Sequence, residues 1–167
     1  MRIDLEIRDV NGIIERFPRA GEIIDRHASR AMRATLDVVE ESVSGETPVN
    51  TGNLRNGWTT EIHGRPTAAF YEGKVMNPVS YALPVETGRK PGKWPPIDAI
   101  EMWVIRKLGI AAGAESRSVA FVIARKIGES GTKGAYMMKR GFEKVKHRVD
   151  KTWAGVPDKI TRELSGR

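Results

Sequence analysis

The sequence predicts an α+β protein in which a small antiparallel sheet is packed by a long N-terminal helix and by C-terminal helices. Near the N-terminus apolar residues alternate with charged ones, as is typical of a strand. A three-and-four spacing of apolar residues, typical of helices, follows and returns near the C-terminus. A chain of 167 residues can bury a core. We therefore expect a single domain over residues 1–167, with an α+β core over residues 1–145 and a basic C-terminal helical extension over residues 146–167.

The first two predicted elements are a short strand and a long helix. Ile3, Leu5 and Ile7 form the alternating pattern, and Asp9 or Asn11 can cap the helix that follows. Positions 18 and 21 are proline and glycine, so this helix either kinks or starts late, near residue 20. Residues 44–46 end it. Its apolar face is predicted to be Ile13, Phe17, Ala20, Ile24, Ala28, Ala31, Thr35, Val38 and Ser42. Glu40 and Glu41 are adjacent on this helix and diverge by about 100°, which predicts solvated side chains rather than a paired site.

Residues 47–55, which read TPVNTGNLR, follow the long helix. The proline favours an extended conformation for the residue before it. Asn50 or Thr51 can accept hydrogen bonds from backbone N–H groups ahead and so start a short helical turn. Leu54 and Trp58 are four residues apart, which lets both dock this turn on a core. We expect the segment to serve as a joint between helix and sheet.

Two strands are predicted next, over residues 58–63 and 67–76, around a turn that contains glycine and proline. An Asn-Pro pair ends the second strand, and residues 81–85 form a short element whose type the pattern leaves open. The alternating residues of the second strand are Ala69, Tyr71, Gly73 and Val75.

The rest of the chain is predicted to be mainly helical. Residues 97–108 keep helical spacing, with Pro96 at the start and Gly109 as the stop. Ser116 or Ser118 starts another helix, and residues 128–134 are predicted to be a flexible connector. The residues expected on the inner face of that helix are Val119, Val122, Ile123 and Ile127.

The final segment again has helical spacing, from Met138 to Leu164. Gly155 and Pro157 interrupt it, so we expect a kink or two separate helices there.

Positive charge is in excess, with 28 Lys and Arg against 21 Asp and Glu, a formal net charge of +7. Residues 139–167 hold nine of these cations and four of the acids, a net +5. A basic balance favours polyanionic partners such as DNA, or an acidic protein surface. Solubility alone is the other explanation.

Few residues are arranged for chemistry. The chain has no cysteine, which removes disulfides and thiolate nucleophiles. His27, His63 and His147 are not at metal-binding spacings, and no G-x-S-x-G elbow occurs. The glycine-rich connector lacks the Lys-Ser or Lys-Thr of a phosphate loop, because Lys133 precedes Gly134. We therefore predict no enzymatic activity, no metal, no cofactor and no small-molecule substrate.

The sequence also predicts a protein without a membrane segment. No apolar run of about 18 residues occurs, and acids lie near the N-terminus where a signal peptide needs apolar residues. We expect synthesis in the cytoplasm.

Residues 87–96 are predicted to be a loop rich in glycine, proline and basic residues. Arg89, Lys90 and Lys93 are expected to be exposed, in a loop that orders on contact with a partner. For Trp94 three roles remain open: stacking on a base, anchoring in a partner's pocket, or folding back over the following helix.

Four stretches in order resemble one family: residues 47–55 (TPVNTGNLR), 81–88 (YALPVETG), 95–110 and 124–132. With the N-terminal strand and long helix, they resemble the phage HK97 gp10-like family of head–tail joining, neck or tail-completion proteins. The resemblance covers roughly residues 1–145. It departs at Arg89, where a threonine often follows the glycine, and in the basic segment beyond Val145.

The resemblance implies a non-enzymatic structural protein of a tailed-phage virion, made in the host cytoplasm. Such a protein would form a homo-oligomeric ring at the head–tail junction and connect the portal or neck to the tail. Neighbouring neck, connector and tail-tube or terminator proteins would be its partners, with non-specific contact to DNA in the lumen. The alternative is a basic nucleic-acid-binding protein. The residues predicted to contact partners are Asn53, Arg55, Glu86, Arg89, Lys90, Lys93, Trp94 and Lys133.

Overall fold

The computed structural model describes residues 3–4, 18–68 and 70–165. It confirms the α+β class, with a long N-terminal helix, small antiparallel sheets and C-terminal helices. The chain forms two compact units. Unit 1 comprises Met1–Glu46, Gly57–Pro78 and Met137–Arg167, and unit 2 comprises Thr47–Asn56 and Val79–Tyr136. That the two fold as one domain stays a prediction.

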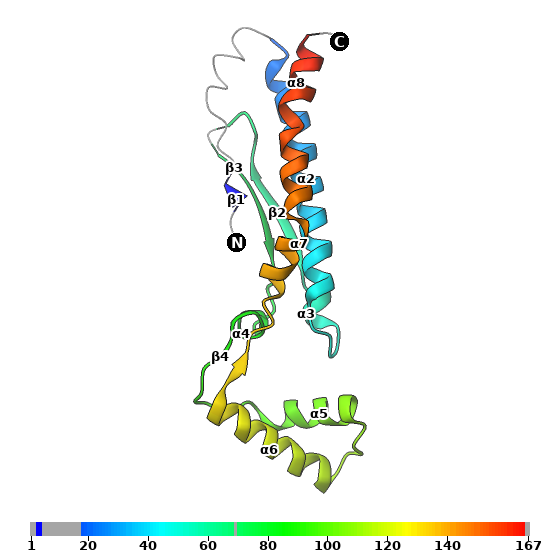
Figure 1. Ribbon diagram of the computed structural model, residues 1–167, viewed down its shortest axis with the longest axis vertical. Helices are drawn as coiled ribbons and strands as arrows, with labels where there is room; N and C mark the ends of the chain where they lie inside the picture. The colour runs from blue at the N-terminus through cyan, green and yellow to red at the C-terminus, as the bar shows by residue number, and fades with distance from the viewer. Residues whose placement is uncertain (1–2, 5–17, 69, 166–167) are drawn as a thin grey trace. The chain divides into compact units, whose positions relative to one another are not determined.

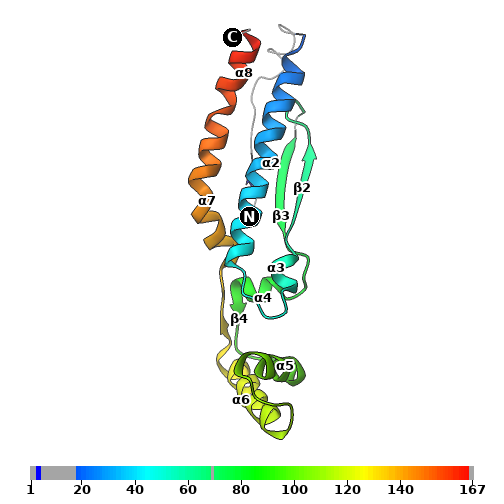
Figure 2. The ribbon, with the colours of Figure 1, turned by 90° about the vertical axis from the view of Figure 1, so that its right-hand side faces the viewer.

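Unit 1 is a helix-and-sheet layer structure (Figure 1). Its sheet has the order β1-β3-β2, and all its strand pairs are antiparallel. The long helix α2 lies between the sheet and the C-terminal helices α7 and α8 (Figure 2). The elements are β1 (Ile3–Asp4), α2 (Ala20–Glu46), β2 (Thr59–Gly64), β3 (Tyr71–Met76), α7 (Met137–Ala154) and α8 (Val156–Leu164).

The core of unit 1 joins α2, β3 and α7. Met32 and Leu36 of α2 are buried against Tyr71 of β3, and Val75 and Trp153 pack on this cluster. Gly73 lets the strand approach the helix closely, because a Cβ there would lie 2.5 Å from the Met32 sulfur. This burial of apolar side chains is what stabilises the sheet on the helix.

Glycine also sets the spacing of α2 and α7. A Cβ on Gly141 would lie 2.6 Å from the Cα of Val43, so the two backbones meet with no room for a side chain. The Ser42 hydroxyl donates to the Gly141 carbonyl at 2.8 Å and spans the same contact.

Ion pairs and hydrogen bonds join α2 to α8 near one end of α2 and to α7 near the other. At one end Glu163 of α8 accepts from Arg26 and lies 2.7 Å from His27 Nε2. At the other end Glu46 pairs with Lys144 and with Arg140, the latter at 3.1 Å. Asp25 accepts from the backbone and hydroxyl of Thr67 at 3.0 and 2.8 Å and so holds the β2–β3 connection.

The predictions for unit 1 were largely correct. The hairpin is confirmed, the long helix begins at Ala20, and α7 and α8 separate at Gly155. The predicted boundary after residue 145 falls inside α7. Several predicted positions, listed here together, lie outside the described residues: Leu5, Ile7, Asp9, Asn11, Ile13, Phe17 and Ala69.

The predicted apolar face of α2 was right as far as Thr35 and wrong beyond it. Val39 and Val43 are buried there, whereas Val38 and Ser42 are half-buried. The face continues through Leu36, one position further along than predicted, because α7 and the sheet contact that side of the helix.

Unit 2 contains a pair of helices and a two-stranded ribbon (Figure 1). Pro96 precedes α5, and Gly109 ends it in the left-handed conformation, as predicted. The elements are α3 (Asn53–Asn56), α4 (Ala82–Thr87), β4 (Gly88–Arg89), α5 (Ile97–Leu108), α6 (Ala114–Ser130) and β5 (Thr132–Lys133).

The inner face predicted for α6 was only partly right. The helix starts at Ala114, before Ser116; Val122 is 63% exposed, and Val119, Ile123 and Ile127 are half-buried. A row of small residues one turn apart is buried instead: Ser116, Ala120, Ala124 and Gly128. Small side chains let other groups approach closely, as the Trp94 ring does at Gly128, where a Cβ would lie 2.3 Å from Cδ1.

The predicted loop at residues 87–96 and connector at residues 128–134 were wrong in part. Helix α6 continues through Ser130, and β4 pairs with β5 in antiparallel register, Gly88 opposite Lys133. Gly131 permits this pairing, because a Cβ there would lie 2.0 Å from the Arg89 carbonyl oxygen. Strands of two residues carry no periodicity that a sequence pattern can show.

Among the helices of the described ranges, we find none with the length and apolar character that crossing a membrane requires.

Candidate interaction surfaces

The TPVNTGNLR segment forms the predicted turn. The backbone N–H of Asn53 donates to the Thr51 hydroxyl at 3.5 Å, and that of Asn56 donates to the Gly52 carbonyl at 2.9 Å. Gly52 has a φ of 88°, which favours glycine. Leu54 and Trp58 are both buried, as predicted.

This segment also forms one wall of a hollow in unit 2, which we call the motif pocket. Its volume is about 240 Å³, and three of its rim residues, Val49, Tyr81 and Trp103, are 40%, 44% and 36% exposed. The hollow has a mixed lining, with the polar Asn50 and Thr51 beside apolar residues, and exposed aromatic and aliphatic groups on its rim are typical of a place where a partner's side chain inserts. The pocket is lined by Pro48, Val49, Asn50, Thr51, Gly52, Leu54, Tyr81, Val85 and Trp103.

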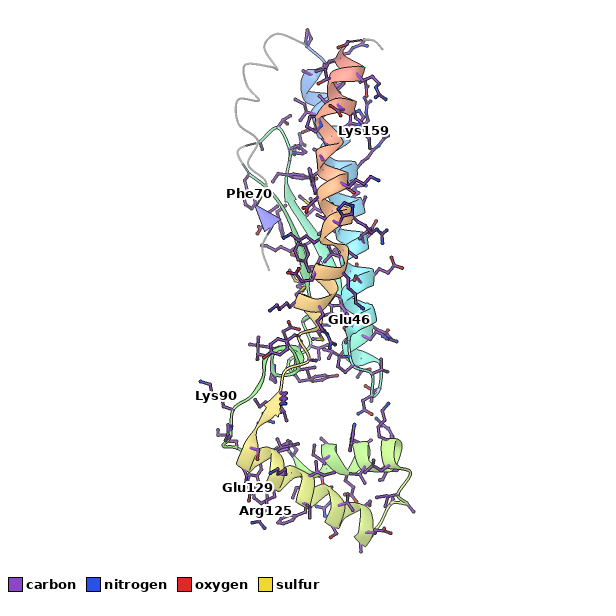
Figure 3. All side chains as sticks on the ribbon, viewed as in Figure 1. Glu46, Phe70, Lys90, Arg125, Glu129 and Lys159 are labelled. Atoms are coloured by element: carbon purple, nitrogen blue, oxygen red, sulfur yellow. The ribbon has the colours of Figure 1, made fainter. Side chains whose placement is uncertain are left out.

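The β4–β5 pairing brings together four predicted contact residues that we call the basic ribbon: Arg89, Lys90, Lys93 and Lys133. All four are exposed, and Lys90 projects outward (Figure 3). The Arg89 guanidinium donates to the Lys93 carbonyl at 3.4 Å. Within the described part of the chain, no carboxylate forms an ion pair with any of the four.

Trp94 lies beside the basic ribbon and folds back, but onto α6 rather than the start of α5. Its ring meets Phe121 edge-on, with centroids 5.4 Å apart and planes at 69°. It also rests on Gly128. The ring is 46% exposed, so part of it stays open to solvent.

The remaining three predicted contact residues lie elsewhere in unit 2. Asn53 and Arg55 are exposed on α3, next to the motif pocket, and Arg55 already has an interaction within the chain. Glu86 is half-buried on α4 and also has one, while its backbone carbonyl accepts from the Tyr136 N–H at 3.0 Å. The eight candidates therefore fall on two areas of unit 2, the α3–α4 region and the basic ribbon.

Sequence reasoning missed the significance of the acidic end of α2. Between Asp37 and Glu46 the helix carries four acids and no Lys or Arg. Glu46 is already paired with cations of α7, and its hydrogen bond with Lys144, together with the nearby Arg140, holds its pKa below the ordinary value and so favours the carboxylate. Asp37, Glu40 and Glu41 form no ion pair with any described residue, and Asp37 and Glu41 are exposed. We call these three the acidic stretch of α2.

Two of the three histidines lie beside single carboxylates, and His147 is exposed on α7. His27 lies beside Glu163, and the Nε2 of His63 is 3.0 Å from a Glu61 oxygen. No group of three or more His, Cys, Asp or Glu suited to a metal ion occurs within the described residues.

Residues 11–88 match the family model described as "Bacteriophage HK97-gp10, putative tail-component". Over this stretch, which is just under half of the chain, the sequence is similar to the HK97 gp10-like family. The matched residues include α2, the β2–β3 hairpin and the two motif segments that line the motif pocket, and they end at the first residue of β4. Residues 95–110 and 124–132, which also entered the resemblance, lie outside the match.

The search of curated proteins and the search of solved structures each found no significant match. The matched family is described as a "putative tail-component", which is consistent with a structural role for this chain in a phage virion.

Proposed function

We propose that this HK97 gp10-like protein assembles as a closed ring at the head–tail junction. There it acts as a neck or tail-completion protein, connects the portal or neck to the tail, and catalyses no reaction. The family match over residues 11–88 is the observation that carries this proposal.

The surface of unit 2 supports an assembly role. A closed ring needs heterologous contacts, so each copy must present two different contact surfaces. Exposed large apolar side chains are concentrated in unit 2, where the motif pocket and the basic ribbon also lie. Those on its two longer helices are Met102, Trp103, Leu108, Phe121 and Val122. Exposed apolar side chains of this kind are typical of surfaces that another protein molecule covers in an assembly.

The charge distribution supports a second feature of the proposed ring, non-specific contact with DNA in its lumen. Residues 139–167 carry a net +5, and Lys146, Lys151 and Lys159 are exposed on α7 and α8. Cations that face a lumen attract phosphates without reading sequence.

Electron microscopy of tailed particles, with this chain located in the density, tests the proposal. We expect a ring of copies between the portal and the tail tube. Particles from which the chain is absent, or in which it lies along the tail shaft, would contradict it.

DNA binding by the purified protein separates assembly from the nucleic-acid-binding alternative. Assembly predicts weak binding to a random duplex at about 150 mM salt. Tight binding by the free monomer, falling steeply as salt rises, would favour the alternative.

A further inference from the structure

Two oppositely charged surfaces are left unpaired within the described chain, and they lie in different units. The basic ribbon belongs to unit 2, whose residues include ten Lys and Arg against five Asp and Glu. Three of those five acids already pair with arginines: Asp98 and Glu101 with Arg117, and Glu129 with Arg125. Little negative charge in unit 2 is therefore available to the ribbon.

The ribbon holds like charges together. Register places Lys133 opposite Gly88 and Arg89 opposite Thr132, so the two cations lie one register position apart, on opposite faces of the ribbon. Lys90 and Lys93 follow within four residues of Arg89. Four cations in so short a segment make the ribbon strongly basic, so its charge suits an anionic partner.

The acidic stretch of α2 holds like charges of the other sign. Asp37 and Glu41 are four residues apart on the helix, and Asp37 and Glu40 are three apart. Like charges at these spacings destabilise a helix. A cationic partner would relieve this cost in turn.

We propose that, in the assembled protein, the basic ribbon of one copy binds the acidic stretch of α2 in the next copy. This rests on the proposed ring, and it names the two surfaces that a heterologous contact requires. Charge complementarity selects the partner: the ribbon carries four cations, and the acidic stretch of a second copy presents three carboxylates. Each surface then neutralises the other at every junction around the ring.

A second copy fits the ribbon better than DNA does. The aromatic ring beside the ribbon, Trp94, already contacts Phe121 edge-on and packs on Gly128, so much of it is used within unit 2 and only the rest is open to a base. DNA would also leave the acidic stretch of α2 without a partner. A protein contact accounts for both surfaces at once.

Engineered cysteines test the contact in assembled particles, because the natural chain has none. Particles carrying Lys93→Cys and Glu41→Cys on the same chain should, after mild oxidation, yield a ladder of covalent multimers that reducing agent collapses. Each single variant should yield no ladder. The matched control pairs Glu41→Cys with Lys159→Cys, an exposed lysine of α8 outside the proposed contact, and should also yield none.

Charge reversal tests the same contact by another route. Lys90→Glu with Lys93→Glu, or Asp37→Lys with Glu41→Lys, should each lower self-association of the purified protein at low salt by at least tenfold, measured by sedimentation. Mixing the two variants should restore it, because each then presents the opposite charge to the other. Matched reversals at exposed sites elsewhere, Lys107→Glu with Lys126→Glu, should leave association unchanged.

The outcomes separate this inference from the ring itself. A ring in the particle with no cysteine ladder, or reversal variants that assemble like the natural protein, would overturn the contact and leave the ring standing. Loss of binding to a random DNA duplex by the ribbon reversal, with unchanged self-association, would assign the ribbon to DNA instead. Absence of any ring from the particle would remove both proposals.

Discussion

Adding one methyl group at Gly141 should destabilise the protein, whereas the same change at Gly45 should stabilise it. Both glycines lie in helices, Gly141 in α7 and Gly45 in the last turn of α2. At Gly141 the new Cβ would lie 2.6 Å from Val43 Cα and 2.8 Å from Val43 N, which are backbone atoms that no rotamer change can move. At Gly45 no atom lies within 4 Å of the new Cβ.

The magnitude follows from three contributions. Overpacking costs about 1–3 kcal/mol, and a lost Ser42–Gly141 hydrogen bond costs about 0.5–1.5 kcal/mol more. Alanine offsets about 1 kcal/mol of this through its higher helix propensity. We expect Gly141→Ala to lower the free energy of unfolding by about 0.5–3.5 kcal/mol, the sum of these contributions. Gly45→Ala should raise it by up to about 1 kcal/mol.

Thermal unfolding followed by circular dichroism measures both variants beside the natural protein. In a chain of this size each kcal/mol shifts the midpoint by about 2–4 °C, so the two variants should move in opposite directions. A Gly141→Ala protein as stable as Gly45→Ala would show that α2 and α7 do not approach this closely, and the reasoning would fail.

Three further predictions follow from particular residues. Leu54→Ala should lower the free energy of unfolding by on the order of 2–5 kcal/mol, because Leu54 is buried. The control is Leu83→Ala, which should cost less than about 0.5 kcal/mol because Leu83 is 69% exposed. Equal denaturation curves for the two variants would contradict the prediction. The hydrogen bond from His27, together with Arg26, holds the pKa of Glu163 below its ordinary 4.5, so the stabilisation by the Glu163 carboxylate should be present above pH 4.5 and lost as pH falls through the lowered pKa. Glu163→Gln should therefore lower the free energy of unfolding at pH 7 and should differ least from the natural protein in acid, where Glu163 is protonated. A difference in unfolding free energy that grows on acidification would argue against the pairing. Residues 89–94 should exchange amide hydrogens faster in the free protein than in the assembled particle, whereas equal protection in both states would remove the idea that this segment orders on contact.

The long, periodic elements could be predicted because their signal is local. The helix from Ala20, the β2–β3 hairpin and the break at Gly155 all follow from apolar spacing and from glycine or proline. Each such element repeats its pattern over several turns or strand residues. A single misleading position therefore did not change the result.

The incorrect predictions concern positions whose burial or strand pairing depends on contacts with another element. On α6 the apolar Val122 is exposed, and the small residues Ala120 and Ala124 are buried instead. Helix-pattern reasoning ranks side chains by hydrophobicity, but a close contact selects them by size. The β4–β5 ribbon was missed for a related reason, since its two strands come from segments about 43 residues apart and have no period of their own.

For the candidate contact residues, too, exposure could be predicted from the sequence, whereas their contacts with distant segments could not. Arg89, Lys90, Lys93 and Trp94 could be selected from composition, because charged residues among glycine and proline are exposed in most folds. Their association with Lys133, and the position of Trp94 against α6, depend on strand pairing and packing.

By itself, the sequence determined the fold class, the main helices and the hairpin, and the segment TPVNTGNLR that resembles the family. These depend on residue types at short spacing, which act within a few residues of chain. The tertiary structure alone decided that this segment lines a pocket with Tyr81 and Trp103, and that cations from two strands gather while Asp37, Glu40 and Glu41 of α2 form no ion pair with a described residue. Those outcomes depend on which distant segments meet, because burial and charge pairing are properties of the folded surface and not of the local chain.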